Sequence, residues 1–171
     1  MSQKVVGQRI LGIDPGFGRT GWGIVEKVKG EWQAVAWGCI ETFTRDPFKD
    51  RLVELHKALQ KVIGKYQPTQ AAVEELFFAK NVRTAMKVGQ ARGVIILTCV
   101  ENNLPVDEFT PLQVKQAITG YGRAEKGQVQ KMLKMLLKIS KKITPDDAAD
   151  ALAVALTGAV SLKMRKKITC G

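Results

Sequence analysis

Residues 146–162 constrain the fold more than any other part of this sequence. After two acidic residues, the segment becomes a nearly continuous run of Ala, Leu and Val. A helix that is apolar nearly all round must be largely buried. Asp150 interrupts the run, and a buried carboxylate costs several kcal/mol unless it has a partner, a proton or a metal ion. The segment therefore predicts a buried helix that carries an acid in need of a counterpart.

The residues that begin this helix allow two interpretations of Asp147. Thr144 suits the N-cap position, Pro145 the first turn, and Asp147 the capping-box position. Capping alone would explain why an acid stands there. However, Asp147 and Asp150 are three residues apart and share one helix face, so the two could also act together.

The rest of the chain alternates between strand and helix patterns. Strands are predicted at residues 9–14, 20–28, 32–42, 71–74 and 105–109, and helices at 51–66, 82–103, 112–119, 125–139 and 146–162. Three strands in series, followed by strands alternating with helices, predict an α/β fold with a five-stranded mixed sheet flanked by helices. We expect one domain over residues 1–162 and a short basic tail over 163–171.

Composition narrows the classes of function. The 171 residues carry 27 Lys and Arg against 16 Asp and Glu, a net charge of +11. Residues 123–167 hold eleven of these basic residues and four acidic ones, a net +7. Such a basic region is typical of a protein that binds a polyanion, although a solvated helix face has the same composition.

The cysteines, the single histidine and the pattern of apolar residues disfavour several other classes of protein. Cys39, Cys99 and Cys170 are scattered and suggest neither a disulfide framework nor a zinc site. His56, the single histidine, is the one candidate for histidine-dependent nucleophilic catalysis. With no apolar run of about 18 residues and no secretory signal pattern, we expect a cytoplasmic protein without a membrane span.

Residues 16–21 match the dinucleotide-binding pattern GxGxxG. That pattern requires a helix directly after the loop, whereas residues 21–25 continue as a strand. We therefore predict a tight hairpin in which the glycines adopt positive φ. The same stretch is similar to the first phosphate loop of the sugar kinase, actin and Hsp70 ATPases, but those proteins need two such domains.

Asp14 and Glu74 each end a short apolar strand. Their structural alternatives are a turn residue and an acid paired with a lysine such as Lys80. If both converge with Asp147 and Asp150, neighbouring charges about 4 Å apart repel by roughly 4 kcal/mol. Such a group needs cations, and oxygen ligands favour Mg²⁺ or Mn²⁺. Two such ions could support hydrolysis of a phosphodiester.

Several motifs then occur in one order: ILGIDPG, AVEELFFAKN, VGQARG, QVKQAITGYGRAEKGQVQ and DDAADALAVA. Together they resemble the RuvC family of bacterial Holliday junction resolvases over residues 9–160. The resemblance implies a ribonuclease-H-like fold and an endodeoxyribonuclease that nicks two strands of like polarity at a four-way junction during recombination and repair. It also implies a homodimer that works beside the RuvA–RuvB branch-migration complex.

The resemblance further implies roles for individual residues. Asp14, Glu74, Asp147 and Asp150 would bind two Mg²⁺ ions, with Mn²⁺ as a substitute, and Asp146 leaves the register of these ligands ambiguous. Lys115 and Lys126 would contact DNA near the scissile phosphate. Phe77 would stack on bases at the crossover, unless it packs in the core or Phe78 takes its place.

Residues 82–103 are our candidate for the dimer helix. Two other functions stay open from the sequence: a related nuclease that cuts structured RNA, and a DNA-binding module in which the acids are only caps and ion pairs.

Overall fold

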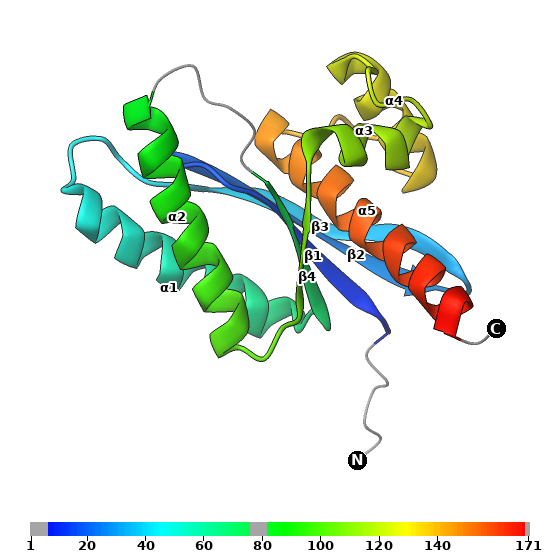
Figure 1. The fold of residues 1–171 in the computed structure, drawn as a ribbon, viewed down its shortest axis with the longest axis horizontal. Helices are drawn as coiled ribbons and strands as arrows, with labels where there is room; N and C mark the ends of the chain where they lie inside the picture. The colour runs from blue at the N-terminus through cyan, green and yellow to red at the C-terminus, as the bar shows by residue number, and fades with distance from the viewer. Residues whose placement is uncertain (1–6, 76–81, 170–171) are drawn as a thin grey trace.

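The structure of the chain, a computed structural model, describes residues 7–75 and 82–169, with side chains in the second range as far as residue 162 (Figure 1). Its centre is a five-stranded sheet in the order β3-β2-β1-β4-β5. The strands are β1 (Arg9–Asp14), β2 (Arg19–Val28), β3 (Glu31–Glu41), β4 (Gln70–Glu74) and β5 (Val106–Phe109). The first three pair antiparallel, whereas β4 and β5 run parallel to β1. The predicted mixed sheet is confirmed.

Helices cover both faces of the sheet (Figure 1). The helices α1 (Phe48–Tyr66) and α2 (Val82–Glu101) lie on one face, and α3 (Pro111–Thr119), α4 (Lys126–Leu136) and α5 (Asp146–Thr169) lie on the other. Successive side chains of a strand point to opposite faces. Accordingly, Leu11 and Ile13 join the core beneath α1 and α2, while Ile10 joins the core beneath α5.

The bounds of two helices differ most from the prediction. Helix α5 continues to Thr169 instead of ending at residue 162, because residues 163–169 contain neither Gly nor Pro and are rich in good helix formers. Helix α4 ends at Leu136 instead of residue 139, because the backbone turns at Lys138, whose φ is 55°. The helical part of the predicted basic tail is therefore continuous with the buried helix.

Two glycines allow α5 to lie directly on the sheet. A Cβ atom on Gly12 of β1 would stand 2.1 Å from the carbonyl oxygen of Ala151, and one on Gly21 of β2 would stand 1.9 Å from that of Asp147. Neither position can accept a side chain without moving the helix. The backbone contact thereby fixes where the first turns of α5 lie over the end of β1.

The loop between β1 and β2 is a hairpin connection, as predicted, and a strand follows it. The predicted reason for its glycines is wrong, because the described glycines with positive φ are Gly30 and Gly120. Gly16 is required for space instead: a Cβ atom there would stand 2.0 Å from the carbonyl oxygen of Arg19. The hydroxyl of Thr20 donates a 2.8 Å hydrogen bond to the Gly16 carbonyl and closes the loop.

Candidate active site

Four acids from three elements gather at one end of the sheet. Asp14 is the last residue of β1 and Glu74 the last residue of β4. These strands are parallel neighbours, with Ile13 opposite Val73, so the two carboxylates leave the sheet at the same edge. Asp147 and Asp150 come from the first turns of α5, which the glycine contacts hold against β1 and β2.

The pKa of Asp14 shows that these acids share one electrostatic environment. Burial, as the largest cause, and the neighbouring acids Glu74, Asp150 and Asp147 together raise this pKa from 3.8 to about 8. Burial also raises the pKa of Glu74, with Lys115 and Lys126 acting in the opposite direction. The predicted convergence of the four acids thus agrees with the structure.

Lys126 is the main cation of this cluster. Its Nζ atom lies 3.0 Å from Oδ2 of Asp150 and 3.5 Å from Oδ2 of Asp146. Burial lowers the pKa of Lys126, but the hydrogen bonds and charges of Asp150 and Asp146 together outweigh this effect and the net shift is upward. The side chain of Asp150 is 37% exposed. The prediction that Asp150 is buried is therefore wrong, because it stands at the rim of the site, whereas the counterpart that this acid was expected to need is Lys126.

Arg19 is a site residue that the sequence did not reveal. Its Nε atom lies 3.1 Å from Oδ2 of Asp147, and its Nη2 atom 3.6 Å from Oε1 of Glu41. Register explains the placement, because Arg19 and Glu41 are opposite each other on β2 and β3. No local pattern predicts that α5 brings Asp147 to the same point.

The predicted N-terminal capping of α5 is corrected by its bounds. The helix begins at Asp146, so Thr144 lies outside it and Pro145 occupies the N-cap position. Asp147 pairs with Arg19. An ion pair across the fold thus accounts for the orientation of this acid better than a cap does.

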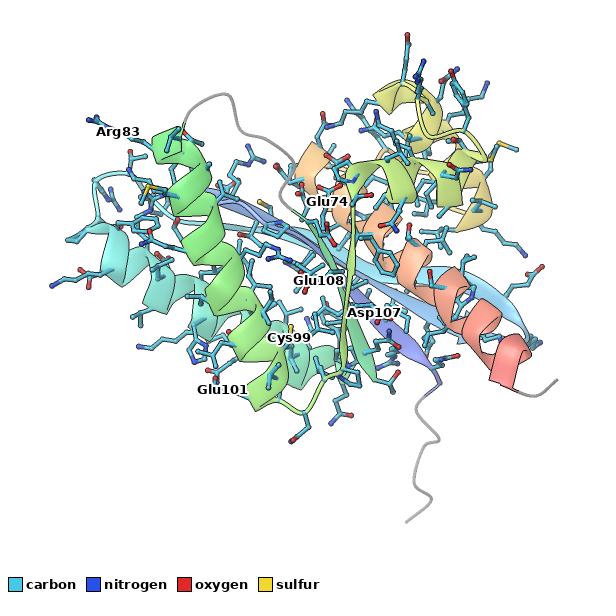
Figure 2. All side chains as sticks on the ribbon, viewed as in Figure 1. Glu74, Arg83, Cys99, Glu101, Asp107 and Glu108 are labelled. Carbon is cyan, nitrogen blue, oxygen red and sulfur yellow. The ribbon has the colours of Figure 1, made fainter. Side chains whose placement is uncertain are left out.

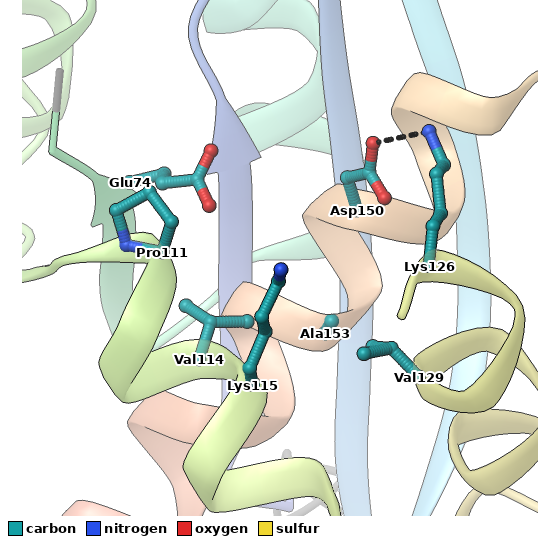
Figure 3. Close-up of a pocket in the computed structure, with 8 residues that line it drawn as sticks. All are labelled: Glu74, Pro111, Val114, Lys115, Lys126, Val129, Asp150 and Ala153. Atoms are coloured by element: carbon teal, nitrogen blue, oxygen red, sulfur yellow. Dashed lines mark hydrogen bonds and ion pairs between the residues drawn. The ribbon is translucent and has the colours of Figure 1, made fainter. Parts of the chain in front are cut away.

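A cavity of about 270 Å³ opens beside the acids (Figure 3). Its polar lining is Glu74, Asp150, Lys115 and Lys126, and its apolar lining is Pro111, Val114, Val129 and Ala153. Figure 3 shows Lys115 reaching from α3 into the space between the two acids. Helix α3 is held by a capping box, in which the Thr110 hydroxyl accepts from the Gln113 N–H. Both lysines predicted near the scissile phosphate therefore lie in the same pocket as two of the predicted ligands.

Comparisons with known proteins assign this chain to a family. A family model described as Crossover junction endodeoxyribonuclease RuvC matches residues 10–158. The chain belongs to the RuvC family. RuvC of Caldicellulosiruptor saccharolyticus is 56% identical over 86% of this chain and 90% of its own length, and RuvC of Petrotoga mobilis is 53% identical over 85% and 90%.

Solved structures agree with this membership of the RuvC family. The structure described as T. thermophilus RuvC in complex with Holliday junction substrate has a TM-score of 0.87 and 35% identity, covering 92% of this chain and 96% of its own. The yeast mitochondrial Holliday junction resolvase Ydc2, at 13% identity and a TM-score of 0.64, shares the fold alone. The predicted ribonuclease-H-like fold is confirmed.

The donor chemistry of the site fits a hard divalent cation, since it consists of carboxylates, and burial together with the neighbouring acids raises the pKa of Asp14 to about 8. However, among residues 7–75 and 82–169, no three Asp, Glu, His or Cys side chains are grouped closely enough to hold one ion without moving. Lys126 and Arg19 balance the charge of Asp150 and Asp147 instead. An ion would have to displace these pairs.

The remaining candidates lie elsewhere in the chain. The Nδ1 atom of His56 is 2.8 Å from the Thr98 hydroxyl, between α1 and α2, so this histidine is structural. Cys39 and Cys99 are free thiols. Phe77, Phe78, Lys80 and Cys170 fall outside the described residues. None of the helices described is long and apolar enough to cross a membrane.

Proposed function

We propose that this chain is a Holliday junction resolvase that cuts two strands of like polarity at a four-way DNA junction by metal-dependent hydrolysis. The observation that carries the proposal is the meeting of four acids beside a pocket whose lining joins two of them, Glu74 and Asp150, to Lys115 and Lys126. It is supported by the RuvC-family match and by the likeness to a RuvC structure that holds a Holliday junction. A basic chain with an acidic pocket suits a polyanion outside the pocket and cations within it.

In this proposal the acids, the lysines and Arg19 have separate roles in cleavage. Asp14, Glu74, Asp147 and Asp150 hold two Mg²⁺ ions, for which Mn²⁺ substitutes. When bound, such ions would supply the Lewis acidity that activates a water and stabilises charge on the phosphate and the leaving oxygen. Lys115 and Lys126 bind the phosphate that flanks the cut, and Lys126 exchanges its pair with Asp150 for this contact. Arg19 orients Asp147 through their ion pair in the metal-free site.

The proposal includes a homodimer, because paired cuts need two sites. Support comes from the outward side of α2, where Val82, Met86, Leu97 and Val100 are each more than half exposed. Their spacing follows a helical stripe that continues through Gly93, beside which nothing lies within 4 Å. An exposed apolar stripe of this kind is typical of a helix that packs on a partner, and we assign it to the second copy.

The remaining parts of the proposal follow from the family resemblance. Phe77 stacks on bases that open at the crossover, since base–aromatic stacking contributes about 1–3 kcal/mol. The enzyme acts in the cytoplasm, in recombination and repair, on junctions that the RuvA–RuvB complex moves.

The test uses a labelled synthetic four-way junction, a linear duplex of matching sequence and a structured RNA, each with Mg²⁺ and with EDTA. We expect symmetric nicks in the junction alone, and only with Mg²⁺. The Asp14→Asn variant should bind the junction and leave it uncut. Cleavage of RNA with the junction intact would favour the rival ribonuclease function. Tight junction binding without cleavage by the wild-type protein would make the acids structural.

A further inference from the structure

A second basic surface lies at the far end of α4 from the acidic pocket. We use the term lysine surface for Lys131, Lys134, Lys138 and Lys141. The first three line a cavity of about 390 Å³ together with Met135, Ile139 and Ser140. An adjoining cavity of about 310 Å³ runs from Lys138 and Lys141 to Trp37 on the edge strand β3. Figure 1 places α4 on the sheet face opposite α1 and α2.

Just after the end of α4, a lysine occupies a backbone conformation that favours glycine. Helix α4 ends with the Ile139 N–H donating to the Lys134 carbonyl at 2.9 Å and the Lys138 N–H donating to the Met135 carbonyl at 3.3 Å. This pattern is a Schellman motif, whose left-handed residue is usually glycine. Here it is Lys138, with φ 55°. A lysine at this position keeps a charged side chain at the end of α4, where it pairs with Glu31.

The charges of the surface are available to a ligand. Lys138 pairs with Glu31, whereas Lys131, Lys134 and Lys141 have no acid within ion-pair distance among the described residues. Lys141 lies over the ring of Trp37, with its Nζ atom 4.7 Å from the ring centroid. The aromatic ring holds the ammonium in place without neutralising it.

The surface also lies on the same helix as Lys126 of the active site. Lys126, at the start of α4, pairs with Asp150. At 1.5 Å per residue, Lys131 and Lys134 lie about 8 and 12 Å further along the helix axis. DNA rises 3.4 Å per base pair. A duplex that enters the pocket therefore passes the lysine surface within roughly two to six base pairs of the scissile phosphate.

We propose that the lysine surface binds the backbone phosphates of one duplex arm of the junction, outside the cleavage pocket, and sets how strongly the arm is held. This inference rests on the proposed function, because the substrate is the junction. Each lysine that contacts a phosphate releases counterions. The loss of one such lysine therefore makes the negative slope of log association constant against log salt concentration less steep by about one.

The experiment measures junction binding in Ca²⁺ from 50 to 300 mM salt for the Lys131→Ala/Lys134→Ala/Lys141→Ala variant. The matched control is Lys57→Ala/Lys61→Ala/Lys65→Ala on α1, on the other face of the sheet; it removes the same charge and includes Lys65, which also lies over an aromatic ring. We expect the magnitude of this slope to decrease by about 2–3 for the first variant and by less than about one for the control. Methylphosphonate linkages two to six base pairs from the cut should weaken binding of the wild-type protein but not of the first variant.

Circular dichroism shows whether both variants are folded, and a Lys→Arg triple variant should restore the slope. Equal losses in both alanine variants would overturn the inference, since they would reflect net charge alone. A slope that does not change would also overturn it while leaving the resolvase proposal intact. A wild-type protein that neither binds nor cuts the junction would overturn both.

Discussion

Asp14 is the residue whose ionisation is most coupled to folding. Its pKa rises from 3.8 to about 8, first because of burial and then because of the acids around it. Between these values the folded state binds the proton more tightly than the unfolded chain, so raising the pH removes stability. The contribution of Asp14 is complete below a pH of about 3.8 and is lost as the pH rises through about 8.

We therefore expect the free energy of unfolding of the metal-free protein to decline between pH 5 and pH 8 more steeply for the wild type than for Asp14→Asn. Urea unfolding in EDTA at both pH values measures this difference. Adding Mg²⁺ at pH 8 should raise the stability of the wild type and not of the variant, because a cation replaces the proton. Parallel pH profiles of the two proteins would contradict the burial of Asp14 among acids.

Lys126 has two partners in the resting site, Asp150 and Asp146. Replacing it with Ala should leave Asp150 open to cations and remove a contact to the scissile phosphate. We expect single-turnover cleavage to slow by about a hundredfold, with junction affinity in Ca²⁺ changed by less than about threefold. Mn²⁺ binding without DNA, followed by electron paramagnetic resonance, should become tighter.

The Lys57→Ala variant, on α1, serves as the control for Lys126→Ala. Weaker Mn²⁺ binding by Lys126→Ala would mean that Lys126 supports the acid cluster instead of competing with the ion. An unchanged cleavage rate in the Lys126→Ala variant would show that Lys126 is a solvated charge with no part in cleavage.

At the scale of elements, the close approach of α5 to the sheet is the feature that builds the site. Gly21→Ala would place a Cβ atom 1.9 Å from the carbonyl oxygen of Asp147, so α5 must shift. We expect a loss of about 1–3 kcal/mol in unfolding free energy and a large loss of cleavage, because Asp147 moves. Gly64→Ala on α1, where nothing lies within 4 Å, should instead stabilise the chain by up to about 1 kcal/mol. A normally active Gly21→Ala variant would contradict this geometry.

The end of α4 gives a second test at this scale. Lys138→Gly and Lys138→Ala both remove the charge and the pair with Glu31, but only glycine relieves the backbone at φ 55°. We expect the glycine variant to be more stable than the alanine variant by about 1 kcal/mol in urea unfolding. Equal stabilities would show that Lys138 costs the fold nothing.

The helices and strands could be predicted from the sequence, whereas several contacts between them could not. The spacing of apolar residues, with the turn and capping residues between segments, predicts all five strands and five helices, because these signals are local. The apolar segment that contains Asp150 correctly predicts a buried helix. The pairing of Asp150 with Lys126, the contact of Arg19 with Asp147 and the spatial need for Gly16 depend on segments distant in sequence. No local pattern encodes them. The four acids could be singled out from their strand-end and helix positions, but their convergence was a supposition that the family resemblance then supported.

For the whole molecule, the exposed stripe on α2 makes the assembly testable. Leu97→Lys places a charge in a stripe that is more than half exposed and should shift the protein from dimer to monomer in sedimentation velocity. A supercoiled plasmid with a cruciform should then yield nicked circles instead of linear product, since two cuts no longer occur in one complex. Val35→Lys, at another exposed apolar position on β3, should remain dimeric. A dimeric Leu97→Lys protein would move the interface away from α2.

The placement of the acids along the chain has a consequence for the cell that makes this enzyme. Asp14 and Glu74 belong to strands that are synthesised early, whereas Asp147 and Asp150 stand on α5, more than seventy residues after Glu74. A nascent chain, or a fragment cut before residue 146, carries half of the acidic cluster and lacks the helix that covers β1 and β2. Such chains cannot assemble the nuclease centre, so the genome is protected from incomplete copies of an enzyme whose work is to break DNA.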